Sequence, residues 1–94
     1  MTELEKLESL IREKHPDWDI TVTDEGIWLY NGKGKCVYDV VCHPGTYGYE
    51  DGLLEGWTGK RSDDTDGWLT ADEALSLFEK ALKGQGKDLE EKNG

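Results

Sequence analysis

The chain of 94 residues carries 21 acidic and 11 basic side chains, a formal net charge of -10, and only 35% of its residues are hydrophobic. A chain of this length builds one core, and its charge disfavours direct binding to the phosphates of nucleic acids or to anionic membranes. Its apolar runs are too short for a transmembrane helix or for the apolar part of a secretion signal. We therefore expect one acidic, cytoplasmic, monomeric domain that attracts basic protein surfaces.

The N-terminal segment predicts a helix over residues 3–14. Thr2 and Glu5 have the spacing of a capping box, in which each side chain binds the other residue's backbone amide. Pro16 disfavours helical geometry at the residue before it, so the helix must end there. One apolar stripe follows the helical repeat, and it consists of Leu4, Leu7, Leu10 and Ile11.

The next part of the chain changes to the two-residue repeat of strands. Apolar and polar side chains alternate over 18–23, and this alternation predicts a half-buried strand. Glycine-containing turns at 24–26 and 31–34 separate it from two further strands at 27–30 and 35–41. Three strands joined by tight turns predict an antiparallel meander.

The stretch 42–67 has no sustained period and contains six glycines and a proline. We expect mostly loop here, with at most one short strand or helical turn near 50–57. A loop of this length is unusual in a small domain, so it is either functional or contains an element that the pattern does not reveal.

A second capping box, Thr70 with Glu73, starts a second predicted helix, which ends at Gly84. Its apolar stripe consists of Ala71, Ala74, Leu75, Phe78, Ala81 and Leu82. The tail at 85–94 has one large apolar residue and is predicted to be disordered. The predicted fold is therefore a single α+β domain at 1–84, with a three-stranded antiparallel meander and both helices packed on one sheet face.

The candidate binding residues lie in the acidic, glycine-rich stretch. Tyrosine and tryptophan anchor interfaces, and carboxylates suit a basic partner. The predicted partner-binding residues are Tyr47, Tyr49, Glu50, Asp51, Glu55 and Trp57. The alternative is that these rings cover the open end of the sheet and enlarge the core. Trp18, Trp28 and Trp68 are expected to be structural, because each starts an element or lies within a strand.

The segment 62–73 resembles the twelve-residue calcium loop of EF-hand proteins. The resemblance implies a calcium site formed by Ser62, Asp64, Asp66, Trp68 and Glu73. The first position holds serine instead of aspartate, and the preceding segment is a poor entering helix. We therefore favour the simpler interpretation, an acidic loop leading into a capped helix, and expect no metal or other cofactor.

No catalytic residue is predicted. Cys42 and His43 are neighbours, so on a strand they point to opposite faces and cannot form a nucleophile and base pair. Together with Cys36 and His15 they could supply four zinc ligands, but their spacing matches no finger or ribbon. We therefore expect a protein that is not an enzyme.

Four segments, at 20–30, 38–43, 47–55 and 67–71, are similar to small, acidic, uncharacterised proteins encoded by phages and prophages of Gram-positive bacteria. The last of them is the junction Gly67-Trp68-Leu69-Thr70-Ala71. The resemblance implies a phage context and no mechanism. Small acidic phage proteins include inhibitors of host nucleic-acid enzymes that imitate the charge of DNA, anti-CRISPR proteins among them. We expect a non-enzymatic accessory protein that binds a basic protein surface, such as a DNA-mimicking inhibitor, with a calcium-binding module as the alternative.

Overall fold

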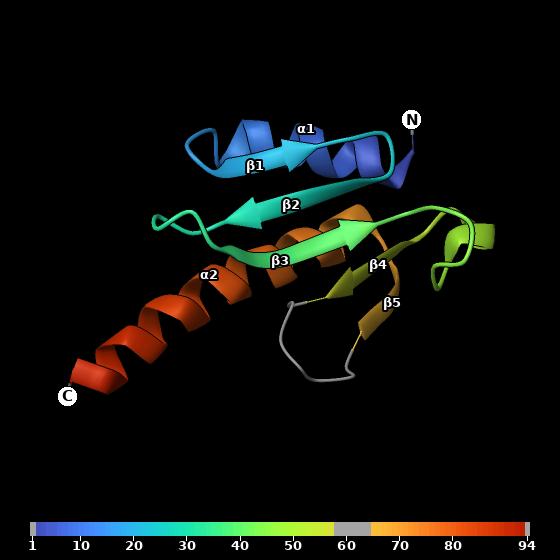
Figure 1. Ribbon diagram of the computed structural model, residues 1–94. Coiled ribbons are helices and arrows are strands. Elements are labelled where there is room, and N and C mark those ends of the chain that lie inside the picture. The colour runs from blue at the N-terminus through green and yellow to red at the C-terminus, as the bar shows by residue number, and fades with distance from the viewer. Residues whose placement is uncertain (1, 58–64, 94) are drawn as a thin grey trace.

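The structure, a computed structural model, describes the backbone of residues 2–57 and 65–93 and the side chains of 2–57 and 66–83. Within these residues the chain forms two α-helices, five strands and one turn of 3-10 helix (Figure 1). In chain order they are α1 (Glu3–Lys14), β1 (Asp19–Val22), β2 (Gly26–Tyr30), β3 (Cys36–Val41), η1 (Tyr49–Asp51), β4 (Leu54–Trp57), β5 (Thr65–Leu69) and α2 (Ala71–Asn93).

The described strands form one antiparallel sheet in the order β1-β2-β3-β4-β5, so every strand pairs with its neighbour in the sequence. The prediction of a three-stranded meander is wrong, because β4 and the start of β5 lie in the stretch 42–67 that we expected to be mostly loop. Gly56 of β4 and Asp66 of β5 pair with each other in the register, and Gly56 is buried whereas Asp66 is exposed. Neither residue is apolar, so no alternating pattern marks these strands.

Tyr38 of β3 occupies the space beside Gly56 and Asp66, two positions of β4 and β5 that carry no apolar side chain. Its ring occupies the space in which a side chain at position 56 would lie. Its hydroxyl donates a hydrogen bond of 2.9 Å to Oδ2 of Asp66. Burial and the neighbouring carboxylate raise the pKa of Tyr38 above its ordinary value, so the hydroxyl keeps the proton that it donates.

Both helices contribute to a single core with the sheet. In Figure 1, α1 lies behind β1 and β2, and α2 passes behind β3. The helices contact each other, and α2 packs on β3, β4 and β5. The predicted packing of both helices on a three-stranded face is therefore wrong in detail, since α2 also lies on β4 and β5. The sequence indicated β4 only as one possible short strand or helical turn near 50–57, and it did not indicate β5. The fully buried side chains at the centre include Leu7, Ile11, Ile27, Leu29, Tyr38, Val40, Leu54 and Phe78.

Both predicted capping boxes are present. The amide of Glu5 donates to Oγ1 of Thr2 over 3.1 Å, and the amide of Thr2 donates to Oε1 of Glu5 over 2.8 Å. At the start of α2, the amide of Thr70 donates to Oε1 of Glu73 over 3.0 Å. Glu3 of α1 adds a contact between the helices, because its Oε1 accepts the amide of Ala71 over 2.8 Å. The starts of the two helices are therefore hydrogen-bonded to each other.

The C-terminal end of α1 is also joined to α2. The imidazole of His15 stacks on Trp18, with ring centroids 3.9 Å apart, and its Nε2 lies 2.7 Å from Oε2 of Glu79.

The sequence predicted that α2 ends at Gly84, whereas the helix extends through Asn93. A glycine inside a helix costs only about 1 kcal/mol relative to alanine, so a glycine at position 84 need not end the helix. The disordered tail at 85–94 stays a prediction.

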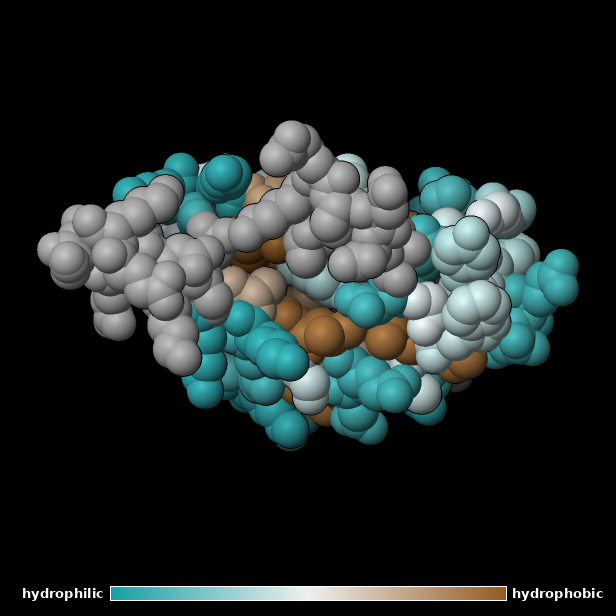
Figure 2. Space-filling view, turned by 90° about the horizontal axis from the view of Figure 1, so that it is seen from below, coloured by the Kyte–Doolittle hydropathy of each residue, from teal (hydrophilic) through white to brown (hydrophobic). Residues whose placement is uncertain are grey.

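No helix in the described part of the chain is long and apolar enough to cross a membrane. Figure 2, which views the molecule from below, shows apolar side chains at the surface in the middle of this face, with hydrophilic side chains around them. At the right-hand end, where the turn before β4 lies in Figure 1, residues of intermediate hydropathy gather. Tyrosine, tryptophan and glycine have hydropathies of this kind, and the segment at this end is rich in them.

Candidate functional site

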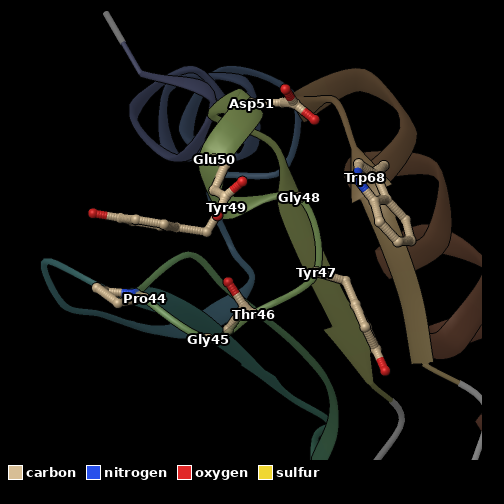
Figure 3. A pocket seen from close by; sticks show the side chains of 9 residues that line it. All are labelled: Pro44, Gly45, Thr46, Tyr47, Gly48, Tyr49, Glu50, Asp51 and Trp68. Atoms are coloured by element: carbon tan, nitrogen blue, oxygen red, sulfur yellow. The ribbon is translucent and has the colours of Figure 1, made fainter.

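A surface pocket lies between the segment that joins β3 to β4 and the edge strand β5. It has a volume of about 410 Å³ and is lined by residues 44–51 and by Trp68 (Figure 3). Two parts of the chain that are distant in sequence thus form one depression. Its volume falls within the range of about 300–1,000 Å³ that is usual for ligand pockets.

Three aromatic rings of this pocket are exposed to solvent. Tyr47 and Trp68 stack on one another, with ring centroids 5.4 Å apart and an interplanar angle of 25°. Their exposed fractions are 57% and 55%, and that of Tyr49 is 42%. These values place the rings on the surface and not in the core. Exposed aromatic rings that are held next to each other are typical of binding surfaces.

The backbone of the pocket is fixed by glycine geometry. Gly48 has a φ of 96°, in the left-handed region, and a Cβ at this position would lie 3.0 Å from Cα of Trp68. The chain can therefore approach β5 closely only with glycine here. The amide of Leu53 donates to the carbonyl of Gly48 over 2.9 Å and closes the turn around η1.

The predicted partner-binding residues divide into three groups. Tyr47, Tyr49, Glu50 and Asp51 line the pocket. Glu55 does not line it but holds it in place, since its Oε2 accepts the amide of Tyr47 over 2.6 Å. Trp57 lies on β4, outside the pocket lining.

Trp57 belongs instead to a row of side chains across the sheet. It pairs in register with Asp39 of β3, which pairs with Trp28 of β2. Residues directly opposite each other on neighbouring strands share a face of the sheet. Burial raises the pKa of Asp39 above its ordinary value. The row therefore forms a second aromatic surface, in which a carboxylate lies between two indole rings.

Trp68 is a pocket residue that the sequence pattern assigned to a structural role. It is a non-glycine residue with a positive φ, 55°. The register of β4 and β5 is irregular at this point, between Leu54 and Gly56. This local irregularity turns the indole outward beside Tyr47. The glycine before Trp68 is the available signal in the sequence, but a glycine inside a strand does not indicate the direction in which its neighbour points.

Only part of the proposed calcium loop can be located. Ser62 and Asp64 lie outside the described residues, and two of the other predicted ligands have partners of their own. Asp66 accepts a hydrogen bond from Tyr38, and Glu73 caps Thr70. Among the described residues, no group of three or more histidine, cysteine, aspartate and glutamate side chains could hold a metal ion.

The cysteines and histidines are dispersed in other contacts. Both cysteines are free thiols, and Cys42 donates to the carbonyl of Leu53 over 3.5 Å. Burial raises the pKa of Cys36 and of Cys42, which lowers the fraction of reactive thiolate. Nδ1 of His43 lies 3.1 Å from the carbonyl oxygen of Pro44, on the rim of the pocket.

No protein-family model, curated protein or solved structure matches the chain. The function must therefore be inferred from the pocket and from the charge of the protein.

Proposed function

We propose that the protein is a non-enzymatic module that binds a basic surface of a partner protein through the pocket formed by residues 44–51 and Trp68. The observation that carries this proposal is the exposure of Tyr47, Tyr49 and Trp68 in a pocket that also contains Glu50 and Asp51. Aromatic side chains supply most of the binding energy in many interfaces, and carboxylates select for basic partners.

The net charge of the protein supports this choice of partner. A formal charge of -10 attracts a basic surface over long distances and repels acidic ones. Such attraction mainly raises the association rate, which reaches about 10⁸–10⁹ M⁻¹s⁻¹ at low salt in favourable cases. Aromatic contacts inside the pocket then slow dissociation. A groove that normally binds nucleic acid is one basic surface of this kind, and the resemblance to phage-encoded proteins favours an inhibitor that occupies such a groove.

Neutralising the acids around the pocket tests the proposal. The triple variant Glu50→Gln, Asp51→Asn and Glu55→Gln removes three charges, and glutamine at position 55 keeps an oxygen acceptor for the amide of Tyr47. With an oligolysine peptide as the probe, we expect affinity to fall by about threefold to about 150-fold, because each of three ion pairs near the surface contributes about 0.2–1 kcal/mol. Isothermal titration calorimetry at low salt measures this loss.

A control variant separates the site from the net charge. Glu13→Gln, Asp17→Asn and Asp19→Asn together remove the same three charges from exposed positions away from the pocket. The control should weaken peptide binding clearly less than the pocket variant. Equal losses in the two variants would mean that only net charge matters, and no loss in the pocket variant would show that the partner binds elsewhere.

A further inference from the structure

The pocket has two aromatic sides and an acidic end. In Figure 3, Tyr47 and Trp68 extend together on one side, and Tyr49 extends away from them on the other. Glu50 and Asp51 belong to η1, which forms the end of the pocket, and both are exposed. The pocket therefore offers aromatic rings and carboxylates to one entering side chain.

The carboxylates at the acidic end of the pocket are accessible to a bound cation. Glu50 and Asp51 are both exposed to solvent, and they add two acidic side chains to the pocket. The backbone of η1 is held by its own turn, in which the amide of Gly52 donates to the carbonyl of Tyr49 over 2.9 Å. The carboxylates thus extend from a fixed turn, and a cation bound there need not order the loop first.

Trp68 lines the pocket and has an unfavourable backbone conformation. Its φ of 55° suits glycine better than any residue with a β-carbon. The indole is nevertheless 55% exposed, so burial in the core does not compensate for this conformation. Its one described ring contact is the stacking on Tyr47. An exposed indole at a position with positive φ is therefore better explained by a role in binding than by a role in folding.

We propose that this pocket receives an arginine side chain of the basic partner, an inference that rests on the proposed function. The guanidinium group is planar and always charged, stacks on aromatic faces, and donates two parallel hydrogen bonds to a carboxylate. The exposed outer faces of the stacked pair Tyr47 and Trp68 provide a surface for such stacking, and the carboxylates of Glu50 and Asp51 provide the acceptors. Lysine has neither the flat surface nor the paired donors, so the pocket discriminates between the two cations.

Three capped tripeptides with glycine on both sides of arginine, lysine or citrulline test this inference. Citrulline keeps the shape of arginine but is neutral. Two-dimensional NMR titrations at low salt should show an affinity for the arginine peptide at least tenfold higher than for the citrulline peptide and severalfold higher than for the lysine peptide. The shifts should fall on residues 44–51 and on the indole N–H of Trp68.

Two substitutions at position 68 separate the ring from the fold. Trp68→Gly should reduce affinity for the arginine peptide to the level of the citrulline peptide. Its unfolding temperature should stay close to that of the unmodified protein, since glycine relieves the backbone strain while the ring stacking is lost. Trp68→Phe keeps an aromatic face and should retain most of the affinity.

The outcomes distinguish this inference from the proposed function. If arginine and citrulline peptides bind equally, or if Trp68→Gly binds arginine normally, the arginine pocket is wrong. The proposed function still stands in that case if the variant with Glu50, Asp51 and Glu55 neutralised loses oligolysine binding. If that variant also binds oligolysine like the unmodified protein, both inferences are wrong.

Discussion

The Gly56→Ala variant is expected to lose about 2–3 kcal/mol of its free energy of unfolding, or more, because the added methyl group overpacks the core. A Cβ at position 56 would stand 2.7 Å from Cζ and 2.8 Å from Cε2 of Tyr38, and closer still to its hydroxyl oxygen. Tyr38 cannot move aside easily, because it is only 2% exposed and its hydroxyl is bonded to Asp66. Urea unfolding measures the loss.

Gly32→Ala is the matched control. A Cβ at Gly32 meets nothing within 4 Å, and the residue lies in an exposed turn. This change should leave stability unaltered or raise it by about 0.4–1 kcal/mol, because alanine restricts the unfolded chain. In a Tyr38→Phe background the loss caused by Gly56→Ala should shrink, since the nearest clashing atom is absent. Equal stabilities of the two alanine variants would contradict the placement of Tyr38 against β4.

Phe78→Ala is expected to cost about 3–5 kcal/mol, as is usual for removal of a buried phenylalanine. Phe78 is fully buried, and its ring lies edge-on to Tyr38 with centroids 5.5 Å apart. Its ring centroid also lies 6.4 Å from that of Trp18. One ring of α2 thus packs on both the sheet and the segment after α1. A domain of this size has a total stability of only about 5–14 kcal/mol, so the variant approaches the unfolded state at ordinary temperatures.

Ser76→Ala on the exposed side of α2 is the control for this loss. It should change the free energy of unfolding by less than about 0.5 kcal/mol. Thermal unfolding followed by circular dichroism compares the two variants. A midpoint for Phe78→Ala close to that of Ser76→Ala would contradict the central position of Phe78 in the core.

The sequence was most informative where local rules decide the structure. The pairs Thr2 with Glu5 and Thr70 with Glu73 mark the helix starts, because a capping box depends only on residues within one turn. The alternation at 18–23 and the turns after it located β1, β2 and β3 within about a residue or two, the usual uncertainty of strand and helix ends.

The last two strands could not be placed from the sequence, which indicated only one possible short strand or helical turn near 50–57, because their packing depends on a residue distant in sequence. Tyr38 fills the space beside the buried Gly56 and donates a hydrogen bond to the exposed Asp66. No pattern within 42–67 carries that information. Only the unusual length of the stretch for a small domain indicated a missed element, and the stretch contains β4 and the start of β5.

The candidate site was predicted in part. Composition indicated Tyr47, Tyr49, Glu50 and Asp51, and all four line the pocket. Trp68 was not predicted, because its outward direction depends on a positive φ that is rare for tryptophan. Trp57 was predicted together with these residues, but it does not line the pocket, because it lies on β4 opposite Asp39 of β3.

The most direct test of the central claim, that a basic partner binds at the pocket of residues 44–51 and Trp68, is an NMR titration with oligolysine at two salt concentrations. We expect shifts at these residues at about 0.1 M salt and their near loss at about 1 M salt, where the screening length falls from about 10 Å to about 3 Å. Shifts that lie mainly outside the pocket, or that persist unchanged at the higher salt concentration, would contradict the claim.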